Sequence, residues 1–279
     1  MYNFIISDNK KKINNFSLKE TEQFLIGIKR LLPRWLNSLP DSEFIAILRK
    51  IYSRKNKKIC IVETGIGSST LLFMHFAMLN NGTLFSWDTN STKASYINMI
   101  ASETLCKLHK KPVSEHWKFI NSTSLDDHTG LKMIHELTKN QIDVSFHDSD
   151  HTWKTISGEI LSIIKKFSNN SYIFVDDANQ NYNFAYEPII NMIRKKNNLK
   201  PIKKIRNNIG QTHFERLPGL IKENVKKFKL ENNFFNKKIK SDIFYKWYNN
   251  DRKKMNKLGM EKLNKIKKRF FMVNLIKVK

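Results

Sequence analysis

Apolar residues in the first part of the chain recur at the spacing of helices. Residues 17–32 open with Ser17-Leu-Lys-Glu20, which fits a capping box and predicts that a helix begins there. Two prolines separate this helix from a second one over residues 41–53, where apolar positions again repeat at helical spacing. Residues 1–56 are therefore expected to form a helical cap in front of the main domain.

The middle of the chain, residues 57–218, alternates short apolar runs with amphipathic segments. Strands are expected at residues 58–62, 83–87, 117–120, 142–146 and 172–175, and helices at 69–79, 92–108, 130–139, 152–167 and 186–196. Two extended runs, 200–205 and 211–216, are expected to add an antiparallel pair. Repeated strand–helix units favour an α/β fold with helices on both faces, and right-handed crossovers make it doubly wound. The prediction is a mostly parallel, Rossmann-like sheet of seven strands.

Residues 219–279 are basic and rich in aromatic side chains. Helices are expected near residues 222–229, 244–257 and 261–271. The aromatic residues are too many for a solvated tail, so this basic, helical C-terminal extension is expected to pack on the core domain.

Composition narrows the class of protein. Of the 279 residues, 40% are apolar and 27% are charged, which excludes a disordered chain. Two cysteines, Cys60 and Cys106, cannot form a disulfide framework and favour a reducing compartment. No apolar run is long enough to span a membrane, and the start of the chain lacks the order of a secretory signal. A cytoplasmic location is expected.

The formal net charge of +25 indicates anionic partners such as nucleic acid or a membrane surface. Residues 220–279 carry +14 of that charge. A second explanation is compositional, because the chain is crowded with Lys, Asn and Ile, which AT-rich codons supply. Charge alone therefore does not identify a partner.

The first predicted strand leads into a glycine turn, Glu63-Thr-Gly-Ile-Gly-Ser-Ser-Thr70. Gly65 and Gly67 allow a tight turn and close approach of a ligand. In an open α/β sheet such a turn lies at the carboxyl edge, where ligands bind. A dinucleotide site would require a third glycine where Thr70 stands, and the Glu63 carboxylate would repel a pyrophosphate. The carboxylate suits a ligand with an ammonium or sulfonium charge, and S-adenosylmethionine carries both.

The second predicted strand ends in Trp87-Asp88. A carboxylate at this strand end can accept hydrogen bonds from both hydroxyls of a ribose. Asp88 fits an adenosine-containing cofactor of either kind, so it does not discriminate between them.

These residues resemble the class I S-adenosylmethionine-dependent methyltransferases over about residues 57–217. The resemblance implies that S-adenosylmethionine is bound by the strand ends and the loops that follow them. The cofactor-binding residues it suggests are Glu63, Gly65, Gly67, Ser69, Thr70, Asp88, Ser122 and Asp148. Ser69 departs from the pattern, since many members have a third glycine there. Ser122 lies where members contact the adenine, although an ordinary polar loop would look the same.

Four of the chain's 12 aspartates follow the fourth and fifth predicted strands, at Asp148, Asp150, Asp176 and Asp177. Because both strands end at the edge that carries the glycine turn, these side chains are expected to meet near the cofactor's methyl group. Packing four carboxylates together costs repulsion unless a cation, a proton or a substrate relieves it. Carboxylate oxygens are ligands that suit Mg²⁺.

The pattern Asp148-Ser-Asp-His151 with Asp176-Asp177 resembles the metal-dependent O-methyltransferases of the macrocin type, within the wider family-24 group. The resemblance makes Asp148, Asp176 and Asp177 ligands of Mg²⁺ and Asp150 the general base. It also makes His151 a base or an orienting residue. The alternative without metal is that Asp148 or Asp150 caps the helix that follows, and that Asp177 contacts the cofactor. His147 lies within the strand and is expected to point into the core.

The function expected is O-methylation of a hydroxyl on a sugar, glycan or secondary metabolite. The alternative is a nucleic-acid methyltransferase, or a non-catalytic nucleic-acid-binding protein, that docks through the basic C-terminal region. The chain lacks the Asn-Pro-Pro-aromatic motif of common base methylases. The helices of residues 17–53 could build either a lid or the face of a homodimer.

Overall fold

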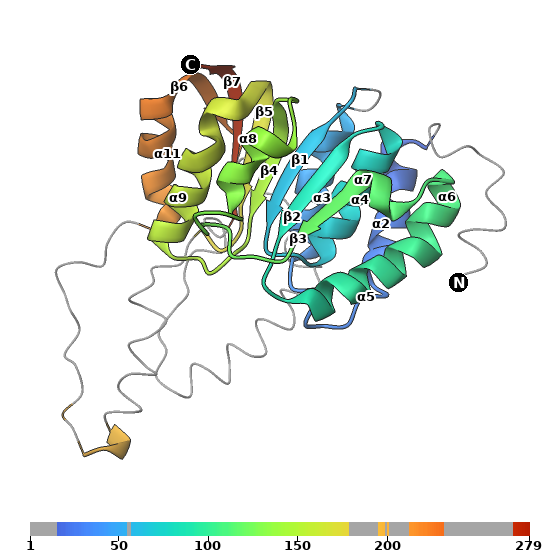
Figure 1. The fold of residues 1–279 in the computed structure, drawn as a ribbon, viewed down its shortest axis with the longest axis horizontal. Helices are drawn as coiled ribbons and strands as arrows, with labels where there is room; N and C mark the ends of the chain where they lie inside the picture. Colours follow the sequence, from blue (N-terminus) through green and yellow to red (C-terminus); the bar gives the residue numbers. More distant parts are fainter. Residues whose placement is uncertain (1–15, 55–56, 179–194, 199, 201–211, 232–269) are drawn as a thin grey trace.

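A single β-sheet forms the centre of the fold. The computed structural model describes residues 16–54, 57–178, 195–198, 200, 212–231 and 270–279 (Figure 1). Within them, seven strands pair in the order β3-β2-β1-β4-β5-β7-β6. The strands are β1 (Cys60–Thr64), β2 (Thr83–Trp87), β3 (Trp117–Ile120), β4 (Ile142–His147), β5 (Phe167–Val175), β6 (Val225–Leu230) and β7 (Phe271–Val278). Only β7 runs against its neighbours, which confirms the predicted mostly parallel α/β sheet.

The strand order places a switch point between β1 and β4. From β1 the chain progresses outward through β2 to β3, and from β4 it progresses in the other direction to β5. The two central strands pair in register, with Thr64 opposite His147. In open α/β sheets the crevice for a ligand opens at such a point, beyond the carboxyl ends of the strands.

Helices cover both faces of this sheet (Figure 1). One face carries α2 (Leu18–Lys29), α3 (Asp41–Tyr52), α4 (Ser68–Leu79) and α5 (Ser91–Ala101), whose apolar residues share one core cluster. Short helices α6 (Lys107–His109) and α7 (Val113–His116) follow α5. The other face carries α8 (Ile134–Leu137), α9 (Trp153–Ile163) and α11 (His213–Asn224), which belong to a second cluster. The predicted doubly wound arrangement is confirmed.

The N-terminal helices form where the sequence predicts them. The capping box that begins α2 is complete, because the backbone N–H of Ser17 donates to Glu20 at 2.7 Å and Ser17 Oγ accepts from the Glu20 N–H. Lys29 is buried and pairs with Asp41 at 2.7 Å, which ties the end of α2 to the start of α3. This cap packs on α4 and is part of the main core.

Two predicted elements near the C-terminus are wrong. Residues 213–216 do not form the expected strand, since they begin helix α11, which presents Leu217 and Ile221 to the core. The predicted helix at 222–229 is largely strand β6, because residues 225–230 pair with β7. This pairing joins segments that lie far apart in the sequence, and local spacing carries no signal of it.

The C-terminal extension completes the sheet. Both β6 and β7 come from residues 219–279, and the division expected at residue 218 falls inside α11. Phe271, expected at the end of a helix, begins β7. The predictions for 186–194, 201–205, 211, 244–257 and 261–269 lie outside the described residues. In the part of the chain that the structure describes, no helix is long and apolar enough to cross a membrane.

Candidate active site

The glycine turn after β1 fits closely against the end of β4. Gly65 has a φ of +77°, and a Cβ on it would lie 1.9 Å from the main-chain oxygen of Asp148. The Gly65 N–H donates to the oxygen of Trp87, and the Asp148 N–H donates to the oxygen of Thr64, both at 2.9 Å. The ends of three neighbouring strands are thereby joined at the carboxyl edge.

Glu63 lies beneath this turn and has no exposed surface. Its carboxylate accepts hydrogen bonds from the hydroxyls of Ser69 at 2.6 Å, Thr70 at 2.8 Å and Ser86 at 2.9 Å. Burial raises the pKa of Glu63 to about 7, although the three hydroxyls oppose that shift. With no exposed surface and three hydroxyls on its oxygens, the Glu63 side chain supports the turn from beneath.

The start of α4 is fixed by the same hydroxyls. Thr70 Oγ1, which donates to Glu63, also accepts from the N–H of Gly67 at 3.0 Å. A Cβ on Gly67 would lie 3.2 Å from the oxygen of Leu36, so the segment between α2 and α3 passes over the turn. Ser69 and Thr70 are buried, which makes them supports of the turn.

Asp88 stands at the end of β2, as predicted, and holds the glycine turn. Its carboxylate accepts from the N–H groups of Ile66 at 3.0 Å and Asn90 at 2.8 Å. Lys93 forms an ion pair with it at 3.1 Å, and the Asp88 side chain is 8% exposed. A ribose hydroxyl that reached Asp88 would have to share the carboxylate with Lys93.

The loop after β3 carries Ser122. Its hydroxyl lies 2.6 Å from that of Thr129, whose main-chain oxygen accepts from the indole N–H of Trp87 at 2.8 Å. The loop is thereby tied to the end of β2, next to Asp88. This arrangement puts Ser122 at the same edge as the other predicted cofactor residues.

His151 lies between two of the predicted acidic residues. Its Nε2 is 3.3 Å from Asp148 Oδ1 and 3.9 Å from Asp177 Oδ2, and all three side chains are 20–23% exposed. Both His151 and Asp177 have a positive φ, of 56° and 46°. Such backbone costs about 1–3 kcal/mol at a residue other than glycine and clusters at functional sites.

The other two predicted acids are engaged with the backbone. Asp150 accepts from the N–H of Thr152 at 2.9 Å and from the hydroxyl of Thr155 at 3.0 Å. It supports the start of α9 beside its N-cap, Thr152, whose hydroxyl accepts from the N–H of Thr155, so the cap role that the alternative without metal gave to Asp150 falls to Thr152. Asp176 is 2% exposed, and its Oδ1 accepts from the Asp177 N–H at 2.8 Å.

The fit of Mg²⁺ to this site is partial. Among the described residues, no group of three or more His, Cys, Asp and Glu side chains is placed to hold a metal ion. Asp148 and Asp177 offer carboxylate oxygens on two sides of His151, but Asp176 is directed at the backbone. The described side chains do not assemble the three-carboxylate ligand set that the resemblance implies.

Residues of α11 that the sequence analysis missed also border the site. His213 Nε2 donates to the main-chain oxygen of His151 at 2.6 Å, and burial lowers the pKa of His213. The Arg216 guanidinium lies 4.1 Å from the ring centre of Trp153, whose other neighbour is the His213 ring. Because residues 211–216 read as an extended run, no helix was expected to bring these side chains here.

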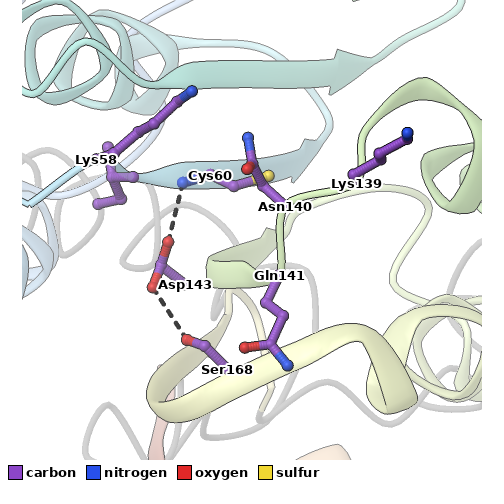
Figure 2. Close-up of a pocket in the computed structure, with 8 residues that line it drawn as sticks. Lys58, Cys60, Lys139, Asn140, Gln141, Asp143 and Ser168 are labelled. Atoms are coloured by element: carbon purple, nitrogen blue, oxygen red, sulfur yellow. Dashed lines mark hydrogen bonds between the residues drawn. The ribbon is translucent and has the colours of Figure 1, made fainter.

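A pocket of about 360 Å³ lies at the opposite edge of the sheet. Figure 2 shows its lining, which includes Lys58, Lys139 and the start of β1 at Cys60. The carboxylate of Asp143 also lines the pocket, where it accepts hydrogen bonds from the Cys60 N–H at 3.0 Å and from the Ser168 hydroxyl at 2.9 Å. This pocket is at the amino ends of the strands and is separate from the predicted cofactor edge.

Residues 62–178 match the family model Methyltransf_24, described as a methyltransferase domain. The match begins in β1 and ends just beyond Asp177, so it contains the glycine turn, Asp88 and the His151 site. The match covers less than half of the chain, and together with the seven-stranded sheet it shows that this central segment is similar to methyltransferase domains.

Several solved structures have a similar chain path. One is an O-methyltransferase from Bacillus cereus in complex with S-adenosylhomocysteine, which is 14% identical to this chain. The comparison has a TM-score of 0.46 and covers 82% of this chain and 91% of that chain. An rRNA methylase from Streptococcus thermophilus has 11% identity and a TM-score of 0.41 over 83% and 93%. The TDP-rhamnose 3'-O-methyltransferase CalS11 has 16% identity and a TM-score of 0.42 over 70% and 93%. A search of curated proteins finds no match. At such identities and scores, none of these proteins' activities is carried over to this chain.

Proposed function

We propose that this enzyme transfers the methyl group of S-adenosylmethionine to a hydroxyl of a sugar, glycan or secondary metabolite, with His151 as the general base. The observation that carries the proposal is the contact of His151 Nε2 with Asp148 at 3.3 Å. Asp148 is also the residue whose main chain touches Gly65, so the imidazole lies beside the predicted cofactor turn.

The chemistry follows from this contact. The Asp148 carboxylate favours the tautomer with the proton on Nε2, which leaves Nδ1 with a free lone pair. Nδ1 is buried and has no hydrogen-bond partner among the described residues. For Nδ1 to take the proton of an acceptor hydroxyl as the oxygen attacks the sulfonium methyl, the side chains that cover it must move or the ring must turn, so the proposal includes such a rearrangement on substrate binding. Most of the rate enhancement in such a displacement comes from alignment of oxygen, carbon and sulfur.

Mg²⁺ assistance belongs to the same proposal as a prediction. Asp148 and Asp177 are the carboxylates that would hold the ion. When bound, Mg²⁺ lowers the pKa of a coordinated hydroxyl. Methyl transfer that is lost in EDTA and restored by Mg²⁺ would support this part of the proposal, and transfer that is unaffected by EDTA would contradict it.

The cofactor site is tested by calorimetric titration with S-adenosylhomocysteine. Asp88→Ala removes the carboxylate that holds Ile66 and is proposed to bind the ribose, and it should weaken binding about 10- to 100-fold. Asp127→Asn, an exposed change in the loop after β3, is the matched control and should bind like the wild type. Equal binding by all three proteins would contradict the assignment of Asp88.

The base is tested by transfer of labelled methyl groups from S-adenosylmethionine to nucleotide-linked sugars and oligosaccharides. His151→Ala should lower kcat by about 10²–10⁴-fold while the affinity for the cofactor changes little. Asp150→Asn keeps an oxygen that can accept from the Thr152 N–H and leaves the N-cap Thr152 in place, so it should retain most of the activity. Loss of activity in Asp150→Asn alone would instead make Asp150 the base.

A nucleic-acid acceptor is the second candidate, on the strength of one observation. Strand β6 lies at the edge of the sheet, and its Lys226, Lys227 and Lys229 are exposed. Replacement of these three lysines by Gln should weaken RNA binding and flatten its salt dependence if this candidate holds. Methyl transfer to sugars but not to RNA would exclude it.

A further inference from the structure

A second buried carboxylate, Glu159, lies on the face of β1 opposite to Glu63. It comes from α9 and has no exposed surface. Thr64 Oγ1 donates to its Oε2 at 3.0 Å, and His147 Nδ1 lies 2.8 Å from the same oxygen. The hydroxyl of Ser124 donates to its Oε1. Glu63 and Glu159 thus bracket the end of β1, one from each helical layer.

The three partners of Glu159 stand at the bases of three different loops. Thr64 immediately precedes Gly65, and His147 immediately precedes Asp148. Ser124 is in the loop after β3, two residues beyond Ser122. The loops after β1, β3 and β4, which carry predicted cofactor residues, are therefore attached to one carboxylate.

His147 connects Glu159 to Asp148 and Asp176 of the acidic site. Its second ring nitrogen, Nε2, lies 2.9 Å from the hydroxyl of Ser145, so the ring is held from both sides. The main-chain oxygen of His147 accepts from the N–H of Asp176 at 3.0 Å, and Asp148 donates to the oxygen of Thr64. A shift of the His147 ring would thus be felt at Asp148 and at Asp176.

The energetics argue that Glu159 is not there for packing. Burying a carboxylate carries a desolvation penalty that apolar residues of similar volume avoid. The rest of the buried face of α9 is apolar, with Ile156, Ile160 and Ile163 fully buried. Glu159 is the one acidic side chain in this helix, and every hydrogen bond described for it goes to a strand end or to the loop after β3.

We infer that Glu159 is a positioning residue for the cofactor, with His147 as its partner. It keeps the glycine turn, the loop that carries Ser122 and the start of the acidic site in mutual register. It acts through Thr64, Ser124 and His147 and does not touch the reacting atoms. The inference rests on the proposed use of these strand ends as the cofactor site.

The test is calorimetric titration of the full-length protein with S-adenosylhomocysteine, alongside thermal unfolding of each variant. Glu159→Gln keeps the volume of the side chain but removes one acceptor, and it should weaken binding about 10-fold or more, since small misplacements at a binding site are costly. The matched control is Ile160→Ala, a neighbouring buried change on α9 that should lower the Tm yet leave the dissociation constant within about twofold of wild type. Unchanged binding by Glu159→Gln, or equal weakening by both variants, overturns the inference.

A double-mutant cycle tests the partnership. His147→Gln should also weaken binding, and the double variant should bind no more weakly than the weaker single variant, because residues of one network are not additive. Fold-changes that multiply would overturn the role of His147 as partner. Wild type that does not bind S-adenosylhomocysteine would overturn the proposed cofactor site itself and this inference with it. Normal wild-type binding with normal binding by Glu159→Gln overturns only the inference.

Discussion

A Cβ atom on Gly65 would lie 1.9 Å from the main-chain oxygen of Asp148. The contact joins the turn after β1 to the loop after β4, the two loops that flank the switch point of the sheet. At a φ of +77°, Gly65 also adopts a conformation that side chains disfavour. A glycine is needed at position 65 because a side chain there would collide with the main chain of the loop after β4.

Gly65→Ala should therefore abolish S-adenosylhomocysteine binding and lower the free energy of unfolding by at least about 1–3 kcal/mol. Gly219→Ala is the control, because a Cβ there meets nothing within 4 Å and the residue lies in α11. It should stabilise the protein by about 0.5–1 kcal/mol, since alanine favours helix. Urea unfolding and calorimetry measure both effects. A Gly65→Ala protein that binds normally would show that the two loops can separate at little cost.

The buried carboxyl of Glu63 should make stability fall as the pH rises. Its pKa is about 7 in the folded protein, above its ordinary value of 4.5, so between these values the folded state holds a proton that the unfolded chain has lost. Each pKa unit corresponds to about 1.4 kcal/mol, which gives a loss of about 3 kcal/mol between pH 4.5 and 7. Glu63→Gln carries no such proton, and the difference in unfolding free energy between the two proteins should follow this slope. A difference that is constant from pH 4.5 to 8 would contradict the assignment.

The ion pair of Arg54 and Asp143, at 2.8 Å, should support the fold without affecting the cofactor site. Both side chains are mostly buried, with 13% and 18% exposed, and they lie at the amino edge of the sheet. Asp143→Ala leaves Arg54 without this partner and should cost about 3 kcal/mol. The exposed pair of Lys107 and Glu103 is the control, and Lys107→Ala should cost less than about 1 kcal/mol. Thermal unfolding measures the loss of stability. Weakened S-adenosylhomocysteine binding by Asp143→Ala would show that the amino edge of the sheet influences the predicted cofactor site at the carboxyl edge.

The two cysteines should differ in reactivity. Cys60 is 2% exposed, and burial raises the pKa of its thiol to about 12, so almost no thiolate is available at pH 8. Cys106 is half-buried, and its thiol pKa is also raised by burial. N-ethylmaleimide should therefore modify Cys106 slowly and Cys60 only after denaturation, as mass spectrometry of the peptides can show. Modification of native Cys60 ahead of Cys106 would contradict the burial of β1.

The sequence by itself determined the fold class and most of the strands. The apolar run at residues 172–175 lies in a strand, as expected, because a strand buried on both faces leaves a continuous apolar signature. Glycine spacing and the position of Asp88 predict that the carboxyl edge of the sheet is the cofactor edge. These features are local, or follow from the handedness of strand–helix units.

Only the tertiary structure decided which polar residues work together. The enclosure of Glu63 includes Ser86 from the neighbouring strand β2, and His151 lies between Asp148 and Asp177, which follow two different strands. The role inferred for Glu159 depends on Thr64, Ser124 and His147, which only the folded sheet brings to one helix. The sequence also did not predict that β7 pairs between β5 and β6. Long-range pairing is driven by burial and by complementary hydrogen bonds, and neither leaves a periodic trace along the chain.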